Sequence, residues 1–212
     1  MPKRLWLALL ALAAVLAVAI AVTAILAGSP GRSSSSSQFS PSASSASGFD
    51  GAALPASVSA PDFTLTDQQG RSVSLSDYRG QVTILTFLYS TCGATCIVIA
   101  QQIRGALDEL PRPVPVLVVS ADPAADAPVH VRRFLEEVSL TGRVQYLTGR
   151  LSRLRSIWRA YRVTPASAGA GAFERFASVL LLDGQGRERV LFEQEQLTPE
   201  SLAHDIRKLH AG

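Results

Sequence analysis

An apolar run, Val82–Tyr89, constrains the fold of this chain more than any other feature, and the only two cysteines follow it closely. The run is rich in residues that favour β-strands and shows no regular alternation of polar and apolar side chains. Such a pattern is typical of a strand that is covered on both faces of a sheet. We therefore predict a buried central strand that ends just before Cys92 and Cys96.

The spacing of the two cysteines points to chemistry rather than to a structural cross-link. Three residues separate Cys92 from Cys96. A disulfide across so small a loop removes little chain entropy from the unfolded state. Free cysteine is usually retained for its reactivity, so the alternative of two small apolar neighbours explains the pair less well.

The remaining patterns predict an α/β fold with a mixed central sheet. Strands are expected at 63–66, 72–75, 82–89, 114–119, 144–147, 178–182 and 189–192, and the first two and the last two form hairpins. Helices are expected from about Cys96 to Leu110, after Asp126 as the cap, across 151–161, and from Thr198 onward. This order places the cysteines at the carboxyl end of a central strand, where α/β sheets carry their sites.

The N-terminus predicts a membrane anchor. Lys3 and Arg4 precede Leu5–Ala27, a stretch of 23 residues without charge. About 20 apolar residues span a bilayer, whereas the apolar part of a cleaved signal is shorter. We expect residues 1–27 to form a cytoplasmic N-terminus and a single transmembrane signal anchor, with cleavage after Ala24 or Ala27 as the alternative.

Composition divides the rest of the chain into a tether and a domain. Residues 28–57 are rich in Ser, Gly, Pro and Ala, which predicts a flexible linker. Residues 58–212 are long enough for one domain. Positive residues before the span favour a cytoplasmic N-terminus. We therefore expect a bacterial inner-membrane protein whose domain faces the periplasm or another extracytoplasmic space.

Charge says little about partners. The formal net charge is +3, and we expect no nucleic-acid partner. Six arginines and no acidic residue lie between Arg143 and Arg162, on and beside an amphipathic helix pattern. This cluster is either a solvated helix face or a contact for an acidic partner or anionic lipid headgroups.

The helix that follows the central strand explains why thiols would be useful there. A helix N-terminus stabilises thiolates, which are the reactive form of cysteine. Two thiolates can close a disulfide or bind one soft cation, and two sulfurs alone suit cuprous copper. Zinc would need about four ligands, and the chain has no second cysteine pair.

Residues Ala60 to Leu209 resemble the SCO/SenC family. The matching stretches are Ala60–Leu65 with Gly70-Arg71, Leu75–Gln81, the strand ending at Tyr89, the spacing of Cys92 and Cys96, Asp122–Pro128 and Leu181–Arg187. The resemblance implies a membrane-anchored, thioredoxin-like domain that assists copper-site assembly in cytochrome c oxidase. It implies Cys92 and Cys96 as copper ligands and as a redox pair.

The chain departs from the family pattern at three positions. Gly93 and Ile97 stand where the family usually has proline after each cysteine. Arg175 falls where the family places its third copper ligand, a histidine. An arginine cannot bind copper, but it can lower a thiol pKa. His130, His204 and His210 are expected to be exposed or capping residues rather than replacement ligands.

These observations leave several functions open. The first is a SCO-like factor that acts through Cys92 and Cys96 as a cuprous carrier or as a dithiol reductant of an oxidase subunit or another thiol protein. The alternatives are a general extracytoplasmic thiol–disulfide oxidoreductase without copper, a peroxidase suggested by Ser90–Thr95, and a non-catalytic binding module. We expect Cys92 to be the more exposed thiol, with the order of attack undecided.

Overall fold

The computed structural model describes residues 47–169, 171–173 and 177–211. The predicted transmembrane segment lies outside these residues, as do residues 28–46 of the predicted linker and Arg175. Within the described ranges, no helix is both long enough and apolar enough to span a bilayer.

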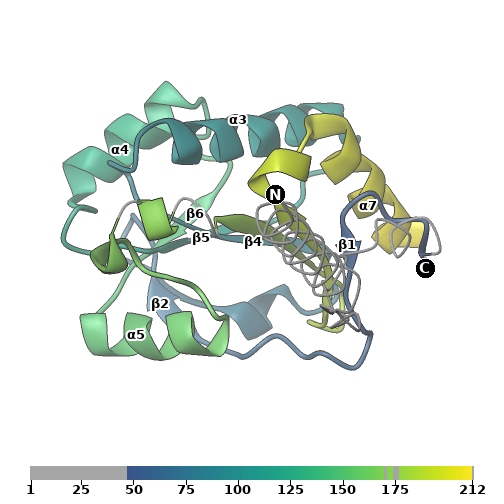
Figure 1. The fold of residues 1–212 in the computed structure, drawn as a ribbon, viewed down its shortest axis with the longest axis horizontal. Helices are drawn as coiled ribbons and strands as arrows, with labels where there is room; N and C mark the ends of the chain where they lie inside the picture. The colour runs from purple at the N-terminus through teal and green to yellow at the C-terminus, as the bar shows by residue number, and fades with distance from the viewer. Residues whose placement is uncertain (1–46, 170, 174–176, 212) are drawn as a thin grey trace, which may run out of the picture. The chain divides into compact units, whose positions relative to one another are not determined.

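A six-stranded mixed sheet organises the domain (Figure 1). Its strands are, in the order in which they lie, β1 (Ala52–Ala53), β8 (Glu188–Glu193), β7 (Ser178–Leu182), β4 (Thr83–Leu88), β5 (Val116–Ser120) and β6 (Gln145–Leu147). Strands β4, β5 and β6 run parallel, and the other neighbours pair antiparallel. The predicted α/β class with a mixed sheet is confirmed.

Strand β4 lies at the centre of this sheet, as its apolar sequence predicts. Ile84 pairs with Val116 of β5 on one side and with Leu181 of β7 on the other. All six residues of β4 are buried, because both faces of the sheet are covered around it.

Helices and a hairpin cover the two faces of the sheet (Figure 1). One face packs against α3 (Ala94–Glu109), α4 (Pro128–Glu137) and α7 (Pro199–Ala211), and the other against α5 (Leu151–Ala160) and the hairpin of β2 (Thr64–Thr66) and β3 (Ser72–Ser74). The described residues also form short 3-10 helices, namely η1 (Leu75–Tyr78), η2 (Ala166–Ala168) and η3 (Gln194–Gln196).

Helix α5 presents the apolar face that the sequence predicts. Leu154, Ile157 and Trp158 are buried, whereas Leu151 at its start is 44% exposed. The arginines of this helix point away from the core and are exposed. These positions fit both the solvated face and the contact surface that the sequence leaves open.

Both predicted hairpins turn on an aspartate with the same hydrogen bonds. Asp67 accepts the backbone N–H groups of Gln69 and Arg71 and the Nε–H of Arg71. Asp183 accepts the corresponding groups two and four residues further along its own hairpin. Burial alone would raise the pKa of these carboxyls, but the hydrogen bonds and arginines outweigh it and lower the pKa of both.

The domain begins earlier than the predicted boundary at residue 58. Residues Ala52–Ala53 pair with β8, and the buried carboxylate of Asp205 accepts the N–H groups of Asp50 and Gly51. Composition alone misassigns residues 47–57 to the linker, because the acceptors that hold them come from a distant part of the chain.

Candidate redox and copper site

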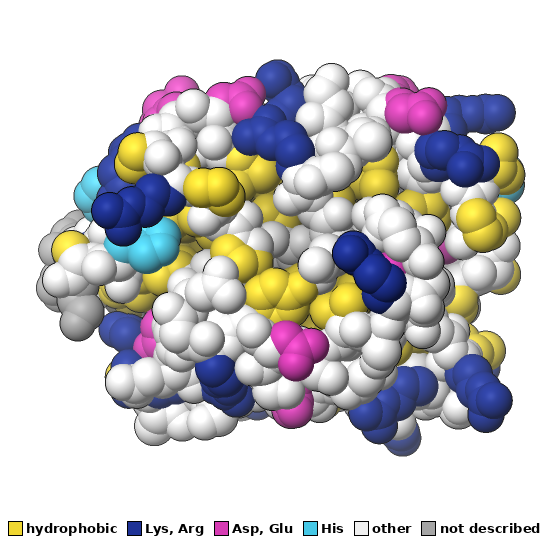
Figure 2. Space-filling view, turned by 180° about the vertical axis from the view of Figure 1, so that it is seen from behind, with side chains coloured by type: hydrophobic (Ala, Val, Ile, Leu, Met, Phe, Trp, Pro, Cys, Tyr) yellow, Lys and Arg dark blue, Asp and Glu magenta, His cyan; other side chains and the backbone are white. Residues whose placement is uncertain are grey.

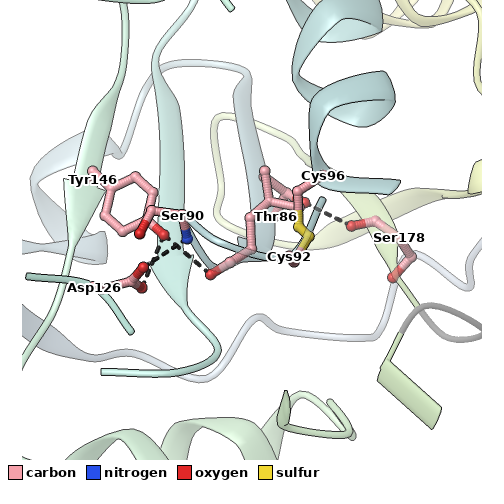
Figure 3. The surroundings of a disulfide bond; sticks show 8 residues. Thr86, Ser90, Cys92, Cys96, Asp126, Tyr146 and Ser178 are labelled. Carbon is pink, nitrogen blue, oxygen red and sulfur yellow. Dashed lines mark hydrogen bonds between the residues drawn. A yellow bond between two sulfur atoms is a disulfide. The ribbon is translucent and has the colours of Figure 1, made fainter. Parts of the chain in front are cut away.

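Cys92 and Cys96 lie at the junction of β4 and α3 and form a disulfide (Figure 3). Their Cα atoms are 5.9 Å apart, a usual separation for a disulfide. Cys92 is 7% exposed and Cys96 is fully buried. The prediction that Cys92 is the more exposed of the two is therefore met, although little of either side chain reaches solvent.

Gly93 gives the cysteine loop a backbone conformation that proline cannot adopt. Its φ is 76° and its ψ is −144°, whereas proline is restricted to a φ near −65°. Gly93 is also the N-cap residue of α3, so Cys96 lies in the first turn of the helix. Glycine therefore fits the backbone conformation at this position, where the family usually has proline. The N–H groups of the first turn of α3 lie next to Cys96.

A buried polar cluster lies on one side of the cysteine loop (Figure 3). Asp126 is 6% exposed, and its carboxylate accepts the N–H of Ser90 at 2.6 Å. The same carboxylate accepts the hydroxyl of Ser120 at 2.6 Å and that of Tyr146 at 2.9 Å. The cluster therefore connects the C-terminal ends of β4 and β5 with β6.

The environment shifts the pKa of both buried acids in this cluster. Burial raises the pKa of Asp126, and the hydrogen bonds from Ser120, Ser90 and Tyr146 offset only part of that effect. Burial, together with the neighbouring carboxylate, raises the pKa of Tyr146 well above its ordinary value. The phenol thus stays neutral and acts as a donor at physiological pH.

The role predicted for Asp126 as a helix cap is wrong. The N-cap of α4 is Ala127, and no side chain caps that helix. The Asp126 side chain points inward because three donors from other segments surround it. Ser120 and Tyr146 were not predicted from the sequence, although a serine that ends an apolar strand just before an Asp-Pro loop is a signal for such a cluster.

Apolar and hydroxyl side chains lie around the rest of the site. The rings of Tyr89 and Phe173 pack edge to face with centroids 5.0 Å apart. Thr86 donates its hydroxyl to the carbonyl of Ser178 at 2.8 Å, which ties β4 to the start of β7 beside the disulfide (Figure 3).

No third metal ligand is preformed at the sulfurs within the described residues. All three histidines are exposed, as predicted, and histidine side chains are visible on the surface in Figure 2. Of the described residues, only Asp50, His204 and Asp205 form a group of three ligand atoms within 4.8 Å of one another, and this group does not include a cysteine. The comparison of Arg175 with the family histidine remains a prediction, since that residue lies outside the described ranges.

The model of the SCO1/SenC family matches residues 52–211, three quarters of the sequence. The chain belongs to the SCO1/SenC family. Its match begins at β1, in agreement with the early start of the domain.

Curated relatives include Sco proteins and a peroxiredoxin. The mitochondrial SCO2 homologue of Bos taurus is 30% identical over 51% of this chain and 42% of its own length. Peroxiredoxin Bcp of Escherichia coli K12 is 36% identical over 40% of this chain and 52% of its own length. The matched segments thus span about half the length of these relatives.

Solved Sco structures share the fold of this SCO1/SenC chain. Apo Sco1 of Thermus thermophilus has a TM-score of 0.62 at 22% identity, covering 76% of this chain and 96% of the other. Copper-bound ScoI of Bradyrhizobium japonicum has a TM-score of 0.54 at 24% identity, covering 72% and 99%. BsSco, named as a cytochrome c oxidase assembly protein with a disulfide switch, has a TM-score of 0.59 at 19% identity, covering 75% and 97%. The thioredoxin-like fold is therefore confirmed.

Proposed function

We propose that this protein assists copper-site assembly of cytochrome c oxidase through Cys92 and Cys96, as a cuprous carrier or as a dithiol reductant. The observation that carries the proposal is the position of the pair at the junction of β4 and α3, on a fold shared with copper-bound ScoI. Family membership and the naming of BsSco as an oxidase assembly protein support the oxidase as the destination.

The two forms of the pair correspond to the two activities. Two electrons and two protons convert the disulfide into a dithiol. The dithiol then transfers the same electrons to a disulfide of another protein, or loses two protons and binds one cuprous ion through both sulfurs. Cuprous copper prefers soft thiolate ligands and is stable with two of them.

The missing third ligand favours cuprous over cupric copper. A stable cupric site normally includes an imidazole, and each of the three histidines is exposed and outside any group with the sulfurs in the described part of the chain. We propose copper as the cargo of the site in its cuprous form. The N-terminal anchor, the inner-membrane location and the periplasmic orientation complete the proposal and rest on the sequence.

An anaerobic copper titration of the full chain in detergent tests the carrier role. The reduced protein is expected to bind one cuprous ion per chain and to hold cupric ion poorly. Cys96→Ser should abolish tight cuprous binding, and His130→Ala should leave it unchanged. Tight cupric binding that depends on a histidine would contradict the two-sulfur site.

A thiol–disulfide oxidoreductase without copper is the second candidate. The bonded state of Cys92 and Cys96 and their buried surroundings favour it. If the reduced chain binds neither copper ion yet reduces a disulfide substrate, this candidate replaces the first. The match to peroxiredoxin Bcp adds one control, because turnover of hydrogen peroxide with a thiol reductant would indicate a peroxidase instead.

A further inference from the structure

Asp126 holds the start of the cysteine loop by a hydrogen bond to its backbone. Its Oδ1 accepts the N–H of Ser90, which lies between the end of β4 and Cys92. The hydroxyl of Ser90 donates to the carbonyl of Ala125 at 3.3 Å. Both hydrogen-bonding groups of Ser90 therefore reach the same short loop, and this loop fixes where the chain leaves β4.

The second oxygen of this carboxylate, Oδ2, accepts two further hydrogen bonds. Oδ2 accepts the hydroxyls of Ser120 and Tyr146, which are themselves almost completely buried. The same hydroxyl of Tyr146 lies 3.3 Å from the carbonyl oxygen of Leu88, the last residue of β4, so its one proton is shared between the two acceptors. The carboxylate is thus the common acceptor for donors from three adjacent strand ends.

This arrangement is unfavourable for stability alone. A buried carboxylate without a cation is costly, and no ion pair of Asp126 occurs within the described residues. Burial raises its pKa, as expected for a charge that the fold does not neutralise. A neutral side chain would avoid the cost of a buried charge, so a carboxylate that is hydrogen-bonded to the start of the cysteine loop requires another explanation.

We infer that Asp126 is a positioning residue for the Cys92–Cys96 pair, acting through the Ser90 amide to favour the disulfide over the dithiol. This inference rests on the proposed redox function of the pair. The hydrogen bonds to its two oxygens act together. The hydrogen bond from the Ser90 N–H to Oδ1 holds the loop in the geometry that closes the disulfide, and the hydroxyls of Ser120 and Tyr146 hold Oδ2 in place.

The test is the equilibrium of the pair with glutathione, measured on the full chain in detergent without copper. The disulfide reacts with two glutathione thiols to give the dithiol and glutathione disulfide. Thiol labelling followed by mass measurement counts the products directly, because the chain has no other cysteine.

Asp126→Asn keeps the shape of the side chain but replaces one accepting oxygen with an NH2 group, which cannot accept the hydroxyls of Ser120 and Tyr146. We expect this variant to shift the equilibrium constant toward the dithiol by about tenfold. Ser120→Ala removes one donor and disturbs packing least, and we expect a shift in the same direction of about threefold. Asp108→Asn, which changes an exposed carboxylate on α3, serves as the matched control and should stay within about twofold.

The outcomes separate positioning from a purely structural role. A structural role alone would change the unfolding temperature of the Asp126 variant and leave the equilibrium unchanged, and that result would overturn the inference. A shift toward the disulfide would also overturn it. If Asp126→Asn does not fold, the glutathione equilibrium of the Ser120→Ala variant decides between the two roles. A failure of the chain to bind copper would refute the carrier role and leave this measurement intact.

Discussion

Gly93 shows how a single residue determines the shape of the cysteine loop. Its backbone conformation, with φ of 76° and ψ of −144°, is one that only glycine adopts readily. A family proline at this position would require a different loop, so the departure from the family pattern is a change of backbone as well as of side chain.

We expect Gly93→Ala to destabilise the protein by about 1–3 kcal/mol. A Cβ atom at this position meets nothing within 4 Å, so the whole cost comes from the backbone conformation. Gly171→Ala is the control, since its Cβ is equally free and its φ is not in the positive range. Urea unfolding of both variants measures the difference, and equal stabilities would show that the loop relaxes without cost.

The raised pKa of Asp126 predicts a pH dependence with a definite sign. Between 3.8, its ordinary value, and the raised pKa, the folded state binds more protons than the unfolded state. The contribution of Asp126 to the free energy of unfolding is therefore fully present below pH 3.8 and is lost as the pH rises through the raised pKa. Tyr146, which faces it, stays neutral throughout this range.

The comparison with Asp126→Asn isolates this effect. Relative to the Asn variant, the wild-type protein should lose free energy of unfolding as the pH rises above 3.8. Unfolding curves at several pH values measure the difference. A difference that grows in favour of the wild type as the pH rises would mean that the carboxylate is stabilised in place, contrary to the effect of its burial.

At the scale of elements, local patterns predict strands and turns well and long-range contacts poorly. The apolar run that forms β4 and the aspartate turns at Asp67 and Asp183 follow from adjacent residues. The inward side chain of Asp126 does not, since its partner Tyr146 is 20 positions away and belongs to another strand.

The same limit explains the misplaced domain boundary. A serine-rich composition predicts a linker but cannot reveal that Asp205, about 150 residues later, accepts the N–H groups of Asp50 and Gly51.

The functional site was only partly predictable from the sequence. Its two sulfurs follow from the sequence. The polar cluster around Asp126 does not, because its members come together only in the folded chain.

The contact between α7 and the N-terminal segment gives a prediction for these elements. Asp205 is completely buried, and both of its oxygens accept backbone N–H groups. Asp205→Asn should destabilise the protein by about 1–3 kcal/mol, because one of these donors loses its acceptor. Glu200→Gln, an exposed change on the same helix, should have little effect. Hydrogen exchange at Ala52 and Ala53 should speed up only in the first variant.

At the scale of the whole molecule, residues 47–57 should count as part of the domain. A protein that starts at residue 58 lacks β1 and leaves the carboxylate of Asp205 without two of its donors. We expect it to be less stable than one that starts at residue 47 by about 3 kcal/mol. Thermal unfolding compares the stability of the two proteins. Equal unfolding temperatures would indicate that the domain starts at residue 58.

The proposed carrier holds copper in a site made of two sulfurs. X-ray absorption at the copper edge of the cuprous-loaded full chain counts the ligands directly. We expect two sulfur ligands and no nitrogen ligand, and we expect the signal of bound copper to be lost in Cys96→Ser. A third ligand from a histidine would contradict the two-sulfur site, and copper without sulfur ligands would contradict the role of the cysteine pair.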